Sequence, residues 1–149
     1  MISLPHFTRV GQFDGARIRG LWSMCASLPS FRLGCKDVSE FGKVMVDEQT
    51  IALESDWGWV FFTNLQNGRA TVSFSFLDGQ LSEHTEMAKE CIRWAMDDLG
   101  LHRVQAIVPS SWKAYLRWLE DKIGFKREGI LRQWTNGNAV MLSLLKEEI

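Results

Sequence analysis

The stretch that decides the fold runs from Gly100 to Arg132 and is GLHRVQAIVPSSWKAYLRWLEDKIGFKREGILR. Its first part, Arg103–Val108, is a short apolar run with the length of a buried strand. An apolar stripe at helical spacing follows, formed by Trp112, Tyr115, Leu116, Leu119 and Ile123. Gly124 can end this helix, and a further strand begins at Phe125. Because a helix joins two strands here, the stretch predicts a mixed sheet containing a parallel pair, with helices on both faces.

Two helices are expected near the start of the chain, after a short extended segment, His6–Arg9. Asp14 is placed to cap the first, whose apolar residues recur at helical spacing up to Pro29. Asp37 and Glu40 have the spacing of a capping box ahead of the second. Both boundaries are therefore marked by residues that satisfy free backbone amides.

From Thr50 onward the pattern becomes alternating, which predicts strands. The three expected strands are Ile51–Leu53, Trp57–Thr63 and Arg69–Leu77, with a hairpin turn at Asn67-Gly68. Ser82 is expected to cap a helix that runs to about Leu99. A final hairpin, Phe125–Gln133 and Ala139–Leu145, turns on Asn136-Gly137. The predicted order is β-α-α-β-β-β-α-β-α-β-β.

Composition narrows the class of protein. At 149 residues the chain is expected to form one domain over residues 1–149. It contains no apolar run of the roughly 20 residues that a membrane span needs. A formal net charge of −1 removes the simplest argument for nucleic-acid binding. We therefore expect neither a membrane nor a nucleic acid as partner.

Cysteine and tryptophan each leave two interpretations open. Three cysteines, Cys25, Cys35 and Cys91, are odd in number and far apart, which favours reduced thiols in a cytoplasmic protein over a disulfide or a metal site. Seven tryptophans are many for this length. We expect most of them in the core, and a flat binding surface is the alternative.

Two segments, LGLHRVQAIV (Leu99–Val108) and LEDKIGFKREGILR (Leu119–Arg132), resemble the C-terminal half of the GNAT N-acyltransferases. The similarity is greatest to the branch that acetylates protein N-termini, including divergent members encoded by phages. It extends over roughly residues 55 to 145, and the N-terminal helices agree in order only. The resemblance implies the GNAT α/β fold, a mixed central sheet with helices on both faces, in the same order that periodicity predicts.

The resemblance also implies acetyl-CoA as co-substrate, with no metal. In this family the pantetheine arm lies between the fourth and fifth strands, and the pyrophosphate lies on the N-terminus of the next helix, where free amides favour an anion. The family's loop there is Arg/Gln-x-x-Gly-x-Gly/Ala. In this chain Gln80 and Ser82 stand where glycines are expected, the basic residue is missing, and Glu83 adds a negative charge. The candidate cofactor-binding residues are Phe76, Leu77, Gly79, Gln80, Leu81, Ser82, His84, Thr85 and Ser111.

Two residues are candidates for catalysis. The tyrosine that often protonates the leaving thiolate in this family has no aligned counterpart here, and Tyr115, one turn earlier, is the candidate general acid. Its place in the apolar stripe is more typical of a core residue. Amine acylation requires a neutral amine, so a base is needed, and Glu54 is the candidate. Asp56, His84 and His102 are alternatives, and all four are common surface residues.

Two functions follow. The first is an N-acetyltransferase in which a primary amine, on a small molecule or a protein N-terminus, attacks acetyl-CoA directly, with a homodimer as one option for its assembly. The second is a catalytically inactive GNAT-fold interaction or virion-associated protein of the bacteriophage type. In that case the same cleft would be partly filled, and the tryptophans would form a protein-binding face.

Overall fold

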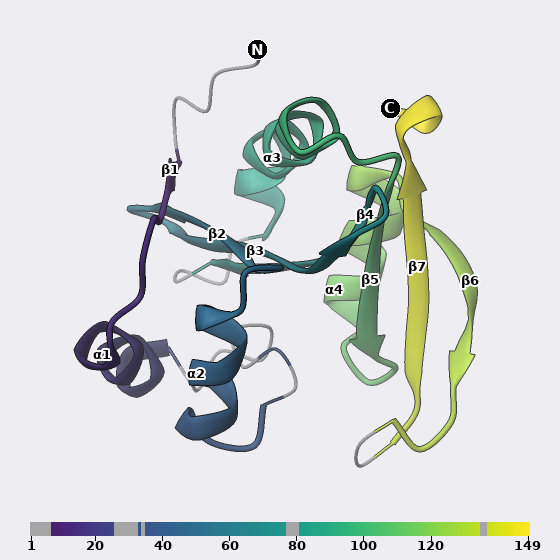
Figure 1. The fold of residues 1–149 in the computed structure, drawn as a ribbon. Helices are drawn as coiled ribbons and strands as arrows, with labels where there is room; N and C mark the ends of the chain where they lie inside the picture. Colours follow the sequence, from purple (N-terminus) through teal and green to yellow (C-terminus); the bar gives the residue numbers. More distant parts are fainter. Residues whose placement is uncertain (1–6, 26–32, 34, 77–80, 135–136) are drawn as a thin grey trace.

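The computed structural model describes residues 7–25, 33, 35–76, 81–134 and 137–149. Its centre is a seven-stranded sheet in the order β1-β2-β3-β4-β5-β7-β6 (Figure 1). The strands are β1 Thr8–Arg9, β2 Ile51–Ser55, β3 Gly58–Gln66, β4 Arg69–Phe76, β5 Arg103–Pro109, β6 Lys126–Leu131 and β7 Ala139–Leu145. Strands β4 and β5 pair in parallel, and the other neighbouring strands among the described residues pair antiparallel. The expected mixed sheet is confirmed.

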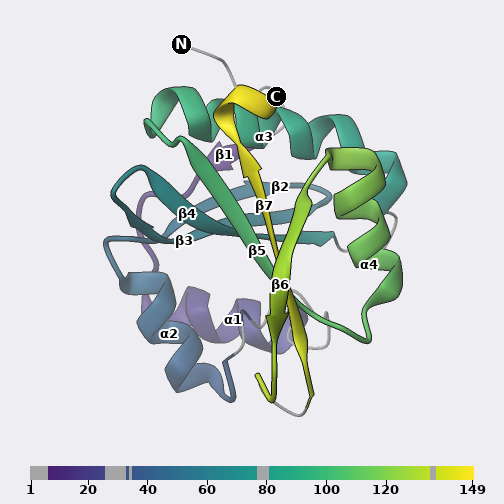
Figure 2. The same cartoon turned by 90° about the vertical axis from the view of Figure 1, so that its right-hand side faces the viewer.

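Helices cover both faces of the sheet. The α-helices are α1 Gly15–Cys25, α2 Val38–Val46, α3 Thr85–Asp98 and α4 Lys113–Arg117, and α4 continues into a π-helical segment, η3 Trp118–Ile123. Short 3₁₀ turns are η2 Leu81–His84 and η4 Lys146–Glu148. Helices α1 and α2 lie on one side of the sheet and α3 on the other (Figures 1 and 2). Among the described residues, no helix combines the length and the apolar character needed to cross a bilayer.

The helix boundaries confirm two sequence predictions and correct a third. The Asp14 carboxylate accepts the Arg17 amide at 2.8 Å, and the Asp37 carboxylate accepts the Glu40 amide at 2.9 Å, so both predicted caps form. Helix α3 instead begins at Thr85, after η2, and no side chain caps it. The prediction that Ser82 caps this helix was wrong, because the chain makes a tighter 3₁₀ turn there first.

The predicted helix over Trp112–Ile123 forms in two parts. Its second half is π-helical, which adds one residue to a turn and leaves the buried residues Trp118, Leu119 and Ile123 on the inner face. Gly124 ends it in a left-handed conformation (φ 104°), as the sequence predicts. The amides of Gly124 and Phe125 both donate to the Leu119 carbonyl at 2.9 Å.

The core consists of two layers separated by the sheet. Alternation along β3 sends Val60 and Phe62 toward α3 and Trp59 and Phe61 toward α1 and α2. Tryptophans contribute to both layers, since Trp59, Trp94 and Trp118 are buried, whereas Trp57 and Trp134 are exposed. Trp22 and Trp112 are partly buried and pack against these layers, so the expectation that most tryptophans belong to the core is confirmed.

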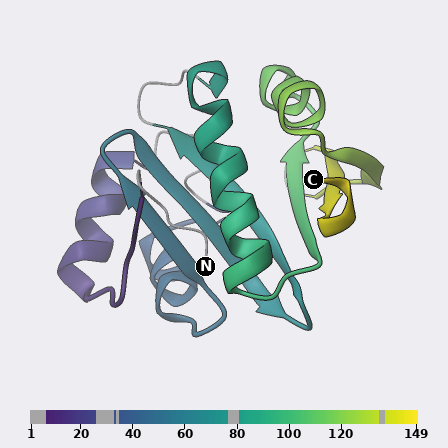
Figure 3. The same ribbon diagram turned by 90° about the horizontal axis from the view of Figure 1, so that it is seen from above.

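Strands β4 and β5 pair over three residues only. The registered partners are Arg69 with Arg103, Ala70 with Val104, and Thr71 with Gln105. Beyond them β4 stays paired to β3 as far as Phe76, and β5 stays paired to β7 as far as Pro109. The two strands diverge toward their carboxyl ends (Figures 2 and 3). We call the region between the mutually unpaired segments Val72–Phe76 and Ala106–Pro109 the wedge.

Candidate functional site

In the wedge, a backbone amide of β4 donates a hydrogen bond to a side chain and not to a neighbouring strand. The Phe74 amide lies on β4, beyond the last β4–β5 pair, and donates to the Tyr115 hydroxyl oxygen at 3.1 Å. Tyr115 comes from α4, the helix that follows β5. A side chain therefore takes the place on β4 that a carbonyl of β5 would hold in a continuous sheet.

Trp118 closes the same region from η3. Its ring meets the Phe74 ring edge-on at 5.3 Å between centroids and the Phe76 ring edge-on at 6.1 Å. Its indole N–H donates to the Thr85 hydroxyl at 3.0 Å, which ties η3 to the first residue of α3. Trp118 was not among the sequence candidates. Its spacing could have identified it as a candidate, because a residue three positions after Tyr115 lies on the same helical face.

The candidate cofactor residues gather where β4 ends and α3 begins. Phe76 is the last residue of β4, and its ring lies 4.6 Å from that of His84, which is buried just before α3. Leu81 and Ser82 form the start of η2, and Thr85 contacts Trp118. Ser111 is exposed and follows β5, at the same edge of the sheet because the two strands are parallel. The candidates Leu77, Gly79 and Gln80 lie outside the described residues.

The fit of these residues to a CoA pyrophosphate is partial. Helix α3 spans 14 residues, so its dipole and first amides favour an anion at Thr85. The Ser82 and Thr85 hydroxyls lie at that end, and the Thr85 hydroxyl donates to the Ser82 carbonyl at 3.1 Å. Glu83 and Glu86 place negative charge in the same turns. The backbone favours phosphate, and the nearby carboxylates oppose it.

The Tyr115 hydroxyl is protonated, so it can act as a donor. Burial of its hydroxyl raises the pKa well above the ordinary value, and the Phe74 amide offsets this only in part. The phenol is therefore protonated at neutral pH. Because its oxygen accepts the Phe74 amide, its own proton remains available to another acceptor.

Glu54 lies away from the wedge. It is on β2, two strands from β4, and both of its carboxylate oxygens accept from the Arg17 guanidinium, at 2.8 and 2.7 Å. That guanidinium also lies over the rings of Phe13 and Trp59, 5.6 and 5.8 Å from their centroids. Glu54 shares the α1 and α2 face with Trp59, whereas Tyr115 packs on the opposite face. The structure does not bring the two catalytic candidates together.

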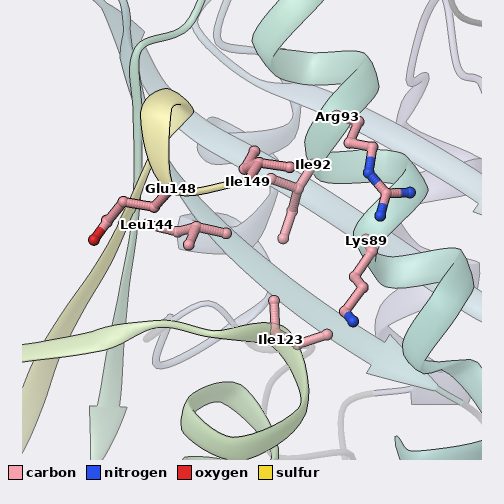
Figure 4. Close-up of a pocket in the computed structure, with 7 residues that line it drawn as sticks. All are labelled: Lys89, Ile92, Arg93, Ile123, Leu144, Glu148 and Ile149. Carbon is pink, nitrogen blue, oxygen red and sulfur yellow. The ribbon is translucent and has the colours of Figure 1, made fainter.

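Two cavities lie away from the wedge. One, of about 170 Å³, lies between α3, η3 and the end of β7 (Figure 4). Its lining residues are Lys89, Ile92, Arg93, Ile123, Leu144, Glu148 and Ile149. The other, of about 590 Å³, lies between residues 9–14 and the end of α2. Within the part of the chain that the structure describes, no three His, Cys, Asp or Glu side chains form a metal-binding group.

No protein-family model and no curated protein matches the sequence. Solved structures match the fold over nearly the whole chain. A crystal structure of a probable acetyltransferase is 19% identical with a TM-score of 0.67, over 97% of this chain and 96% of that one. A GNAT-family acetyltransferase from Bacillus anthracis is 16% identical with a TM-score of 0.65, over 99% of each chain. A single-residue mutant of the spermidine N-acetyltransferase SpeG from Vibrio cholerae is 13% identical with a TM-score of 0.71, over 95% of this chain and 96% of that one.

At these identities the comparisons establish architecture alone. The chain has the fold of the GNAT acetyltransferases, which confirms the fold that the sequence resemblance implied. The element order and the mixed sheet with its parallel β4–β5 pair agree with it.

Proposed function

We propose that this chain is an N-acetyltransferase that binds acetyl-CoA in the wedge and transfers the acetyl group to a primary amine. The observation that carries the proposal is the early end of the β4–β5 ladder at Thr71 and Gln105, while both strands continue. The unpaired part of β4 leads to the N-terminus of α3, and free strand amides beside a helix N-terminus suit an amide-containing arm and a pyrophosphate. The fold likeness to acetyltransferases supports the same assignment.

The residues of the wedge suit direct transfer. The bound thioester supplies the activated acetyl group, which passes to a neutral amine as the thiolate leaves. Tyr115, protonated and directed at β4, is the proposed proton donor to that sulfur. A backbone amide near Phe76 or Leu77 is the proposed donor to the carbonyl oxygen.

Glu54 remains the proposed base. Since Arg17 holds its carboxylate two strands from β4, it would take the amine's proton through water. Glu54→Gln should then lower turnover and leave the affinity for acetyl-CoA unchanged. Equal turnover in this variant and the wild type would remove Glu54 from the mechanism.

The test of the proposal is calorimetric titration of acetyl-CoA into the wild type and a matched pair of variants. Ser82→Glu adds a negative charge in the exposed turn before α3, and it should abolish binding by repelling the pyrophosphate. Gln49→Glu adds the same charge at an exposed position before β2 and should bind like the wild type. Equal affinity in all three proteins would place any CoA site away from α3.

A second candidate function is favoured by the contents of the wedge. Tyr115 and Trp118 pack against Phe74 and Phe76, and the Tyr115 hydroxyl already holds a β4 amide. A GNAT-fold protein that has lost the cofactor and binds other proteins would show this arrangement. Wild-type protein that gives no heat of binding and no rise in melting temperature with millimolar acetyl-CoA would favour this candidate.

A further inference from the structure

We propose that the Tyr115 hydroxyl is a latch: it occupies the β4 amide of Phe74, so any ligand entering the wedge must compete with it. This inference rests on the proposed function, in which that ligand is the pantetheine arm of acetyl-CoA. It adds a closed state, held by the chain itself, to the site described above.

The geometry of the latch depends on the end of the strand ladder. Where β4 and β5 are paired, at Thr71 and Gln105, no side chain is needed between the strands. Three residues further along β4, the Phe74 amide has passed the last β5 partner and donates to a residue 41 positions away in sequence. The bond therefore joins α4 to β4 across the wedge.

Two tryptophan rings pack against the Tyr115 ring. The Trp112 ring meets it nearly edge-on at 6.2 Å, and the Trp118 ring lies at 5.9 Å. Trp118 is fixed in turn by its bond to Thr85. The ring is thus positioned before any ligand arrives, and opening requires the phenol to leave Phe74.

The cost of opening is set by one hydrogen bond between a hydroxyl and an amide. A ligand that binds only the open state has its apparent affinity reduced by the fraction of molecules that are open. The net free energy of one such hydrogen bond corresponds to about a fivefold change in the fraction of open molecules. Tyr115→Phe, which keeps the ring and removes the oxygen, should therefore bind acetyl-CoA about fivefold more tightly than the wild type.

The experiment measures two quantities on the wild type, Tyr115→Phe and Trp134→Phe. The first is hydrogen exchange of the Phe74 amide by NMR, with amides of β3 as internal reference for global stability. The second is the dissociation constant of acetyl-CoA by calorimetry. The latch predicts faster Phe74 exchange relative to β3, together with tighter binding, in Tyr115→Phe. Trp134→Phe is the aromatic control, since Trp134 is exposed after β6 and does not contact Tyr115 or Phe74 in any ring pair of the described residues.

The outcomes separate the latch from the proposed function. Unchanged Phe74 exchange in Tyr115→Phe overturns the latch. Equal acetyl-CoA affinity in that variant and the wild type also overturns it, because the hydroxyl then competes with nothing. A third outcome is selectively faster Phe74 exchange in Tyr115→Phe, with no binding of acetyl-CoA by any of the three proteins. This outcome supports the latch, but it rejects acetyl-CoA as the ligand and with it the proposed function.

Discussion

Among the glycines that the structure describes, Gly58 is the one at which an added Cβ would lie closest to another backbone atom. Its φ is +149°, and a Cβ placed on it would lie 2.1 Å from the Ser75 carbonyl oxygen. Gly58 pairs with Phe76, so this close approach fixes the end of β4 beside the wedge. A glycine here permits the strand ends to meet without a side chain between them.

Gly58→Ala should lower the free energy of unfolding by about 2 to 4 kcal/mol, because it combines a backbone clash with an unfavourable φ. Urea denaturation measures this directly. Gly20→Ala is the control: Gly20 lies in α1, and a Cβ added there would meet no atom within 4 Å, so alanine should stabilise the protein by roughly 0.5 to 1 kcal/mol. Equal stability of Gly58→Ala and the wild type would contradict the described β3–β4 register.

Glu128 gives the stability a predicted dependence on pH. Hydrogen bonds from Arg103 and then Ser143 lower the pKa of its carboxyl from 4.5 to about 2. Since the folded pKa lies below the unfolded one, ionised Glu128 stabilises the protein fully above pH 4.5, and this contribution is lost as the pH falls through 2. The carboxylate is 39% exposed, so solvent screens the effect.

Glu128→Gln should therefore be less stable than the wild type at pH 7, and the gap should narrow between pH 4.5 and 2. Urea midpoints at pH 7, 4 and 2.5 measure the gap. A constant difference across this range would mean that the Arg103–Glu128 pair does not depend on the carboxylate's charge.

At the scale of elements, sequence periodicity predicted most helices and strands, because buried faces repeat with the period of the backbone. It did not predict the π-helical segment Trp118–Ile123, since the apolar stripe records which residues face inward and not which carbonyl each amide meets. For the same reason, sequence periodicity did not predict the wedge. The Tyr115 position in an apolar stripe indicated burial, and its bond to Phe74 depends on tertiary placement that no local pattern contains.

The contact between η3 and α3 is also tertiary, and it can be tested. Trp118→Phe removes the indole N–H that donates to Thr85 and should lower the free energy of unfolding by about 1 to 2 kcal/mol. Thermal or urea unfolding measures the loss. Thr85→Ser, which keeps the hydroxyl acceptor, is the control and should stay closer to the wild type. If both variants match the wild type, the Trp118–Thr85 bond does not tie the two elements together.

At the scale of the whole molecule, the resemblance and the element order led to the GNAT fold, and the structure matches acetyltransferases over nearly its full length. The candidate site was predicted less completely. Phe76, His84 and Thr85 do gather at one end of β4, while Glu54 forms an ion pair with Arg17 on the other face of the sheet. An isolated carboxylate in a sequence does not reveal which distant guanidinium will bind it.

The proposed function requires acetyl-CoA to bind between β4 and β5. Titration of isotope-labelled protein with acetyl-CoA, followed by amide chemical shifts, tests it most directly. The largest shifts are expected at the amides of Val72–Phe76, Ala106–Val108 and Thr85, at the edges of the wedge. Shifts confined to the cavity beside Lys89 and Arg93, or no shifts at millimolar acetyl-CoA, would contradict it.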